Sequence, residues 1–277
     1  MTAEGAPIRL ALAAAAARID SATPRLDAEL LMAHALGISR EALLLARLDD
    51  PAPAGFAPLL ARRLRHEPIA YITGTRGFWT IELAVGPGVL VPRADSETLI
   101  EAAVAHFAGT PGPRRILDLG TGSGALLLAA LDEWPEASGV GIDRSAPALA
   151  IAADNARRLG MADRATMRAG GWDGTGERFD LILCNPPYIE DDAPLPDEVA
   201  GHEPASALFA GADGLDDYRR IALLLAGQLA PGGIAVVEVG AGQALAVTAL
   251  LDAAGFATAN RRDLGGHERC IIVQVPE

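Results

Sequence analysis

The sequence predicts an α/β protein with a doubly wound parallel sheet, joined through a β-hairpin to a small N-terminal helical domain. Helical periodicity dominates up to about residue 68, strand-like alternation with closely spaced glycines follows, and strands then alternate with helices to the C-terminus. The 277 residues suffice for a core in each domain. We therefore predict a helical domain over 1–68, a hairpin linker over 69–91 and an α/β domain over 92–277.

The helical domain is expected to contain four helices. Thr23 and Pro24 supply a cap and a first-turn proline for the second of them, and Gly37 ends it. The expected ranges are 8–19, 26–36, 40–48 and 56–65. The last one ends in three arginines, Arg62, Arg63 and Arg65, which we expect to form a solvated face or to meet an acidic partner.

In the α/β domain, alternating patterns predict a helix over 96–107 and then five strands separated by helices. The strands are expected over 115–119, 139–143, 164–168, 179–184 and 234–239, and the helices over 124–133, 146–159, 215–229 and 244–254. Two final strands, over 257–262 and 269–275, are expected to pair antiparallel at one edge of the sheet.

The composition excludes several classes of function. A net charge of −13 argues against a broad contact with duplex DNA, and the absence of lysine excludes Schiff-base chemistry. Cys184 and Cys270 lie far apart, so neither a disulfide framework nor a metal site is expected.

An apolar run over 10–17 resembles the core of a signal peptide, but its flanks differ. Glu4 and a single arginine precede it, and Arg18 and Asp20 follow at helical spacing. No run approaches the length of about 20 residues that a membrane span requires. We therefore expect an ordinary helix here and a cytoplasmic protein.

A glycine-rich loop follows the first predicted strand of the sheet and opens a helix. Its residues are Gly120, Thr121, Gly122, Ser123 and Gly124. Glycines allow a tight turn and the close approach of a ligand to the backbone, and Asp143 at the end of the next strand is placed to accept ribose hydroxyls. Gly120, Gly122 and Ala125 also satisfy the relaxed dinucleotide fingerprint, so these features alone permit both NAD and S-adenosylmethionine.

Asp118 favours S-adenosylmethionine. This carboxylate precedes the loop where the cationic methionine end of that cofactor would lie, whereas a pyrophosphate there would be repelled. Asp118 could also brace the turn. Trp172, after the third strand, is expected to serve as a platform for the adenine ring, although a core position would also explain it.

The strand over 179–184 ends in the tetrapeptide Asn185-Pro186-Pro187-Tyr188. Ligands bind at the carboxyl ends of parallel strands, so this loop is expected to face the cofactor. The Asn185 side-chain oxygen and the Pro186 carbonyl can each accept one N–H of a planar NH₂ group, which orients the nitrogen and favours its developing positive charge. The two prolines stiffen the loop, and Tyr188 can stack on the amide plane. The motif predicts methyl transfer to a planar amide or amine nitrogen.

Further segments extend this pattern over nearly the whole chain. They are Asp27-Ala28-Glu29-Leu30-Leu31, Arg62-Arg63, Glu67-Pro68-Ile69-Ala70-Tyr71-Ile72-Thr73-Gly74, Val91-Pro92-Arg93, the glycine loop, Asn185-Pro186-Pro187-Tyr188-Ile189, and Glu203-Pro204 with Ala207-Leu208. With them the chain resembles the protein-(glutamine-N5) methyltransferases that modify class I peptide chain release factors. The resemblance implies the Rossmann-like fold of class I methyltransferases, S-adenosylmethionine as cofactor, and the glutamine of a Gly-Gly-Gln loop as acceptor.

By position, the resemblance implies cofactor contacts from the five loop residues Gly120 to Gly124 and from Asp143, Trp172 and Asn185. It implies a glutamine site over Asn185, Pro186, Pro187 and Tyr188, and a release factor gripped by both domains. Three departures from the family pattern are visible: Ala94-Asp95-Ser96 replaces Pro-Glu-Thr, His66 stands where glycine is common, and Gly171 stands where an acidic residue is usual. Asp173 can substitute for that last residue.

Two alternatives remain open. Adenine-N6 nucleic-acid methyltransferases share the Asn-Pro-Pro-Tyr motif, but they need a basic target-recognition surface. A non-catalytic cofactor-binding factor would keep the glycine loop but would not need the tetrapeptide. We expect a protein substrate, no membrane contact and no direct binding of nucleic acid.

Overall fold

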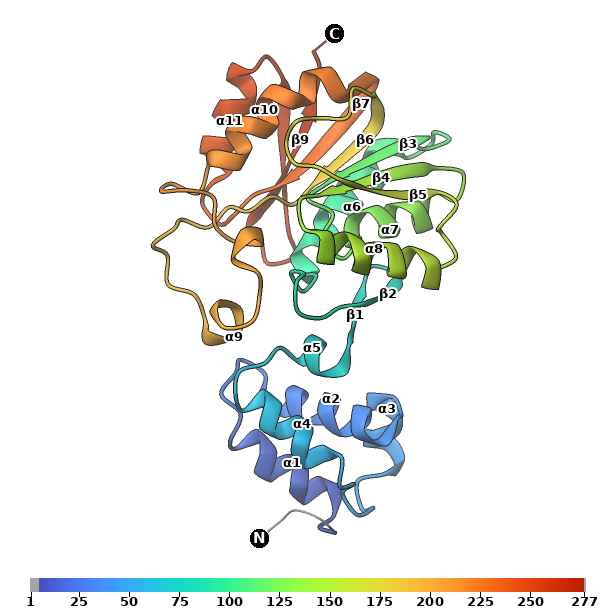
Figure 1. Ribbon diagram of the computed structural model, residues 1–277, viewed down its shortest axis with the longest axis vertical. Coiled ribbons are helices and arrows are strands. Elements are labelled where there is room, and N and C mark those ends of the chain that lie inside the picture. The colour runs from blue at the N-terminus through green and yellow to red at the C-terminus, as the bar shows by residue number, and fades with distance from the viewer. Residues whose placement is uncertain (1–4, 277) are drawn as a thin grey trace. The chain divides into compact units, whose positions relative to one another are not determined.

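The computed structural model describes residues 5–276, which divide into two compact units. The helical unit comprises the chain up to Thr75 together with Leu195–Glu203, and the sheet unit comprises Arg76–Pro194 together with the chain from Pro204 onward. Both units are drawn in Figure 1. The α/β class with a helical N-terminal part is confirmed, whereas the domain limits stated above stay predictions.

The helical unit is built on four helices that the sequence predicted. They are α1 (Ile8–Ala16), α2 (Pro24–Leu36), α3 (Arg40–Ala46) and α4 (Phe56–Arg63). Pro24 opens α2, and Gly37 ends it with a φ of +65°, as expected of a left-handed helix end. Leu12, Leu31 and Met32 are fully buried in the core of the unit. Among residues 5–276, no helix is long and apolar enough to span a bilayer.

Residues 69–73, which the sequence placed in the hairpin linker, form a short helix instead. This helix, α5 (Ile69–Thr73), begins after Pro68 and ends at Gly74, whose φ is +80°. Its adjacent residues Tyr71 and Ile72 are both buried, which does not match the alternation of a half-buried strand. The hairpin is confined to β1 (Thr75–Phe78) and β2 (Ile81–Ala84), with Trp79 and Thr80 between them.

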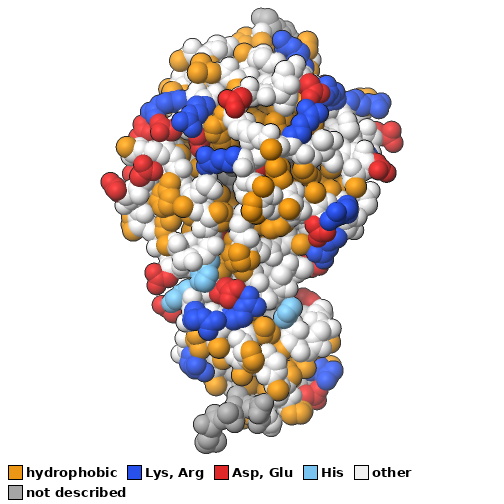
Figure 2. Space-filling view, in the orientation of Figure 1, with side chains coloured by type: hydrophobic (Ala, Val, Ile, Leu, Met, Phe, Trp, Pro, Cys, Tyr) orange, Lys and Arg blue, Asp and Glu red, His pale blue; other side chains and the backbone are white. Residues whose placement is uncertain are grey.

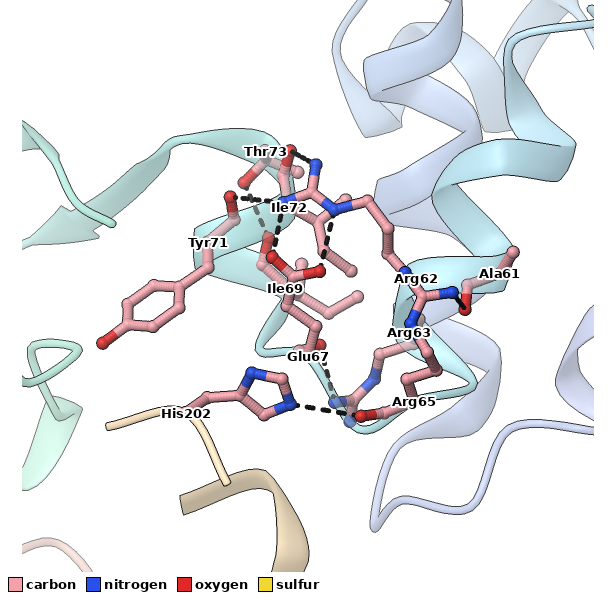
Figure 3. A network of polar contacts seen from close by, with 10 residues as sticks. All are labelled: Ala61, Arg62, Arg63, Arg65, Glu67, Ile69, Tyr71, Ile72, Thr73 and His202. Carbon is pink, nitrogen blue, oxygen red and sulfur yellow. Dashed lines mark hydrogen bonds and ion pairs between the residues drawn. The ribbon is translucent and has the colours of Figure 1, made fainter. Parts of the chain in front are cut away.

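The arginines at the end of α4 divide between the two expected alternatives: Arg65 is exposed, whereas Arg62 and Arg63 meet acidic groups. Arg63 is only 4% exposed. Its guanidinium lies 2.8 Å from Asp27 of α2 and 2.8 Å from Glu198 of α9 (Asp197–Ala200), and it also donates to the Glu67 carbonyl. Arg62 pairs with the Glu67 carboxylate (Figure 3). Arg63 is buried because Asp27 is buried, and a buried carboxylate requires a partner.

The sheet unit contains seven strands in the order β5-β4-β3-β6-β7-β9-β8. Their ranges are β3 (Arg115–Leu119), β4 (Ser138–Asp143), β5 (Ala165–Ala169), β6 (Phe179–Cys184), β7 (Leu229–Glu238), β8 (Ala257–Arg262) and β9 (Glu268–Gln274). β3 to β7 are parallel, and β9 pairs antiparallel with both β7 and β8. The predicted antiparallel edge is therefore confirmed.

Helices cover both faces of this sheet (Figure 1). On one face lie α6 (Glu97–Phe107), α7 (Ala125–Glu133) and α8 (Ala146–Arg158), and on the other lie α10 (Asp216–Gln228) and α11 (Ala244–Ala253). Two 3₁₀ turns, η1 (Ala94–Ser96) and η2 (Ala205–Ala207), flank these layers. Burial of the central strands on both faces explains their nearly continuous apolar sequences.

The order of the strands determines where a ligand can bind. From β3 the chain proceeds to β4 on one side, whereas β6 lies on the other side of β3, so the order reverses between β3 and β6. Open α/β sheets bind ligands outside the carboxyl ends of the strands at such a reversal. The loops after β3, β4 and β6 meet there, and they carry most of the predicted site.

Candidate active site

The loop after β3 turns through three glycines in the left-handed region. Gly120, Gly122 and Gly124 have φ values of +74°, +55° and +85°, a conformation that L side chains rarely adopt. The Gly120 and Thr121 amides both donate to the Ile142 carbonyl of β4 at 2.9 Å. The loop is therefore tied to the neighbouring strand, and substitution of its glycines would strain it.

Asp143, at the end of β4, connects this loop to the next helix. One carboxylate oxygen accepts the Gly122 amide at 2.9 Å, and the other accepts the Ser145 amide at 2.8 Å. Each carboxylate oxygen can accept a further hydrogen bond. Asp143 thus shapes the loop and still has acceptor capacity for a ligand.

A cavity of about 410 Å³ opens at the carboxyl ends of these strands. It is lined by five of the predicted cofactor residues, Gly120, Gly122, Asp143, Trp172 and Asn185, and by Pro187. Sequence analysis did not single out three further lining residues, Leu90, Arg144 and Arg220. Asp173, suggested as a replacement for an acidic residue at position 171, also borders the cavity.

Trp172 has both environments that the sequence left open. The residue packs against the hydrophobic core around β6 and β7 and also lines the cavity. Its indole N–H donates to Asp217 of α10 at 2.8 Å, and Asp217 also pairs with Arg220 at 3.2 Å. The hydrogen bond holds the indole ring beside Gly120. A Cβ atom added at Gly120 would lie 3.4 Å from this ring.

A second cavity, of about 60 Å³, lies beside the glycine loop. Thr121, Ser123, Asp118 and Ser96 line it, and it shares Leu90, Gly120, Gly122 and Asn185 with the larger cavity. The shared residues make the two cavities neighbours. Of the predicted loop residues only Gly124 borders neither cavity among the residues described, and its amide closes the turn onto the Thr121 carbonyl.

Asp118 is almost completely buried at the wall of this smaller cavity. Its Oδ2 accepts from the Thr121 hydroxyl at 2.6 Å and from the Leu127 amide at 3.3 Å, so it braces the turn. Its Oδ1 has no hydrogen-bond partner within residues 5–276. Burial raises the pKa of the carboxyl to about 7, because the desolvated charge is only partly compensated.

Asn185 lies where the two cavities meet. Its Nδ2 donates to the Ser96 hydroxyl at 3.1 Å. Within the described part of the chain, Pro186 and Tyr188 line neither cavity. The Tyr188 hydroxyl donates to Glu238 of β7 at 3.4 Å, and burial raises its pKa to about 12. The tetrapeptide therefore presents Asn185 and Pro187 to the cavity, while the predicted stacking of Tyr188 on a substrate stays a prediction.

Comparison with known proteins identifies the family. Residues 11–74 match the family model of the PrmC N-terminal domain, and residues 95–200 match that of the methyltransferase small domain. The chain is 47% identical to the release factor glutamine methyltransferase of Rhodospirillum rubrum over 91% of this chain and 79% of the relative. It is 44% identical to that of Xylella fastidiosa over 98% of both chains. The chain belongs to the release factor glutamine methyltransferase family.

A solved structure supports the fold independently. A methyltransferase from Pyrococcus furiosus, 18% identical, superposes with a TM-score of 0.52 over 78% of this chain and 98% of its own. The family membership confirms the resemblance drawn from the sequence and the prediction of a methyltransferase. It also decides against the dinucleotide alternative that the glycine loop left open.

Proposed function

We propose that this enzyme transfers a methyl group from S-adenosylmethionine to the side-chain nitrogen N5 of the glutamine in the Gly-Gly-Gln loop of class I peptide chain release factors. One observation carries the proposal: Asn185 borders both cavities, so a nitrogen that it holds lies where the two cavities join. The family relatives are named as release factor glutamine methyltransferases. Because such an acceptor works in translation, we place the enzyme in the cytoplasm.

The residues of the two cavities fit S-adenosylmethionine. Asp143 would accept hydrogen bonds from the ribose hydroxyls with its remaining lone pairs, and Trp172 would cover the adenine. Asp118, with its unpartnered Oδ1 at the smaller cavity, would hold the ammonium group of the methionine end. When bound, the cofactor supplies a methyl group on a positively charged sulfur. A volume of about 410 Å³ is within the usual range of cofactor pockets.

Asn185 and the Pro186 carbonyl would hold the acceptor. An amide nitrogen is a poor nucleophile because its lone pair is delocalised, so its orientation has to be controlled. Asn185 donates its own NH₂ to Ser96, which leaves Oδ1 as the acceptor for one N–H of the glutamine amide. A second acceptor at Pro186 would fix the NH₂ plane and stabilise the positive charge that develops on nitrogen.

The surface charge favours a protein acceptor over the nucleic-acid alternative. The chain carries a net charge of −13. On the face of the sheet unit drawn in Figure 2, acidic and basic side chains are interspersed and do not form one broad basic field. We further propose that the helical unit helps to bind the release factor, as the family resemblance of the sequence implies.

Transfer of labelled methyl from S-adenosylmethionine tests the proposal. Purified release factor should take up the label, whereas a factor with the loop glutamine replaced by alanine, and duplex DNA, should not. Label on DNA, or equal label on the glutamine variant, would contradict the proposal.

Asn185→Ala separates an enzyme from a non-catalytic cofactor-binding factor. We expect kcat to fall about 10²- to 10³-fold, the loss seen when one preorganised hydrogen-bonding group is removed from a transition-state site. Full methylation by the variant would remove Asn185 from the mechanism.

A further inference from the structure

Glu238, the last residue of β7, is a buried carboxylate that none of the predicted roles includes. The residue is 1% exposed. Burial raises the pKa of its carboxyl to about 7, and its Oε2 has no hydrogen-bond partner within residues 5–276. Within that range Glu238 also lines neither cavity. A ligand in the cavities would therefore not explain why a desolvated carboxylate is placed here.

Ser96 connects this carboxylate to the candidate active site. The Ser96 side chain acts to lower the pKa of the Glu238 carboxyl, which indicates that its hydroxyl lies near that carboxylate, and the Ser96 oxygen accepts a hydrogen bond from the Asn185 Nδ2 at 3.1 Å. Ser96 is itself only 4% exposed and lies in η1, at the start of α6. The three residues come from different elements, η1, β7 and the loop after β6, so the contact exists only in the folded sheet unit.

The hydrogen bonds that connect Asn185, Ser96 and Glu238 can be assigned donors in one consistent direction. The Ser96 oxygen already accepts from Asn185, and an ionised carboxylate can only accept, so the nearby Glu238 carboxylate is a suitable acceptor for the single hydroxyl proton of Ser96. The Ser96 oxygen can then only accept from Asn185. Asn185 must therefore turn its NH₂ toward Ser96, which directs its Oδ1 away from Ser96 and leaves it available to the substrate amide.

We propose that Glu238 is a positioning residue that acts through Ser96 to fix the direction of the Asn185 amide. The proposal rests on the function proposed above, in which Asn185 Oδ1 accepts an N–H of the substrate glutamine. With a neutral Glu238, the carboxyl group can donate to Ser96, and the Ser96 proton becomes free to point at Asn185. The reversed amide would then present NH₂ to the substrate NH₂, and two donors cannot bond to each other.

Tyr188 ties the other end of the tetrapeptide to the same carboxylate, since its hydroxyl donates to Glu238 at 3.4 Å. Glu238 thus contacts the motif directly through Tyr188 and indirectly through Ser96. Other titratable and charged groups also influence this carboxylate. They are Arg269 and Cys270 of β9, Asp95 of η1, Tyr218 of α10, and Cys184 at the end of β6.

Side-chain amide resonances of Asn185 test the proposal without any substrate. In protein labelled with ¹⁵N-asparagine, the signal that is lost in Asn185→Ala should shift with pH, with a midpoint near the Glu238 pKa of about 7. The shift should be absent in Glu238→Gln. Asp118, whose pKa is also about 7, is the competing cause, so the shift should persist in Asp118→Asn. Persistence in Glu238→Gln, or no shift at all, would overturn the proposal.

Methylation kinetics on intact release factor give the second test. For Ser96→Ala we expect kcat to fall about tenfold, the rate equivalent of one hydrogen bond, with the KM for the cofactor unchanged. Ser96→Thr retains the hydroxyl and should restore the rate. Wild-type kcat should decline below about pH 7, and Glu238→Gln should lose that decline.

The outcomes separate the two proposals. A wild-type enzyme that labels no release factor while the Asn185 signal still titrates would refute the proposed substrate alone. Equal rates for Ser96→Ala and wild type, with the wild-type acid limb retained in Glu238→Gln, would refute the positioning role alone. Thermal unfolding of each variant verifies that it is folded.

Discussion

A buried ion pair of the helical unit contrasts with two buried carboxylates of the sheet unit that have no ion-pair partner among residues 5–276. In the helical unit, Arg63 and Asp27 are both buried and lie 2.8 Å apart. In the sheet unit, Asp118 and Glu238 are each 1% exposed, and each keeps one carboxylate oxygen without a hydrogen-bond partner among residues 5–276. A buried charge with an ion-pair partner contributes to the folded structure. A buried carboxylate with an unpartnered oxygen can still bind a ligand or a proton.

The pKa values follow the same division. Burial tends to raise the pKa of Glu29 in α2, but hydrogen bonds and charges from Arg25 and Arg40 bring it below its ordinary value. For Asp118, burial dominates and the pKa rises to about 7, because the Thr121 and Leu127 hydrogen bonds compensate only part of the lost hydration. Glu29 has two arginine partners, whereas no cation is among the causes of the Asp118 shift.

The largest expected effect is on the stability of the helical unit. Arg63→Met leaves the buried Asp27 with the Thr23 hydroxyl but without its cationic partner, so we expect the free energy of unfolding to fall by about 3–5 kcal/mol. Hydrogen exchange of α2 and α4 localises the loss to this unit. Arg65→Ala is the matched control and should change little, because it removes a guanidinium that donates to the exposed Ala61 carbonyl.

A double variant sharpens this result. Asp27→Leu combined with Arg63→Met replaces both buried charges with apolar groups, and it should recover most of the stability that Arg63→Met loses. The remaining partner, Glu198, has a 35% exposed side chain and can be hydrated alone. A double variant as unstable as the single one would show that the arginine acts through something other than charge pairing.

The sheet unit should lose stability as pH rises from about 4 to about 7. The folded pKa values of Asp118 and Glu238 lie near 7, above their ordinary values of 3.8 and 4.5, so the folded state binds more protons in this window. Each carboxylate should contribute about 3–4 kcal/mol, at 1.36 kcal/mol per pKa unit. All three tryptophans, Trp79, Trp134 and Trp172, lie in the sheet unit, so their fluorescence reports its unfolding.

Asp118→Asn and Glu238→Gln should each flatten this dependence and raise the stability above pH 7. Carboxylates with lowered pKa values, which occur in both units, act in the other direction and only below about pH 4.5, so they do not interfere. A slope that both variants retain would show that other groups hold the excess protons.

Asp118→Asn should also weaken the binding of S-adenosylmethionine by about tenfold, because it removes one charge-assisted hydrogen bond. The control is the ligand 5′-methylthioadenosine, which lacks the ammonium group, and its affinity should not change. Calorimetry measures both. An equal loss for the two ligands would mean that Asp118 acts only by bracing the glycine loop through Thr121.

Local pattern in the sequence predicted many of the residues that line the two cavities, and their roles stay predictions. The glycine loop, Asp143 and the tetrapeptide all follow apolar strands, and the parallel order of those strands brings them to one edge. Ser96 and Asp217 were missed because their partners Asn185 and Trp172 lie 89 and 45 positions away. Their pairing depends on how the helices pack on the sheet.

Two further features depend on burial, which local sequence does not show. The residues before the hairpin were assigned to a linker because glycines at 74 and 77 suggested turns, but the burial of Tyr71 and Ile72 favours a helix there. For Arg63 the sequence left open a solvated face and an acidic partner, and Asp27, 36 positions earlier, is that partner. Glu238 did leave a signal, since it is the one charged residue near the end of the apolar strand over 234–239.

The smallest expected effect tests whether burial, and not charge alone, determines how much an ion pair stabilises this protein. Arg157 and Asp154 on α8 form an ion pair of 2.8 Å, the same distance as Arg63 to Asp27, but their side chains are 67% and 47% exposed. Arg157→Ala should change the free energy of unfolding by less than about 0.5 kcal/mol, because water and salt screen the pair. Urea unfolding in low and high salt measures it. A loss comparable to that of Arg63→Met would mean that pair geometry, and not desolvation, determines the stability of both units.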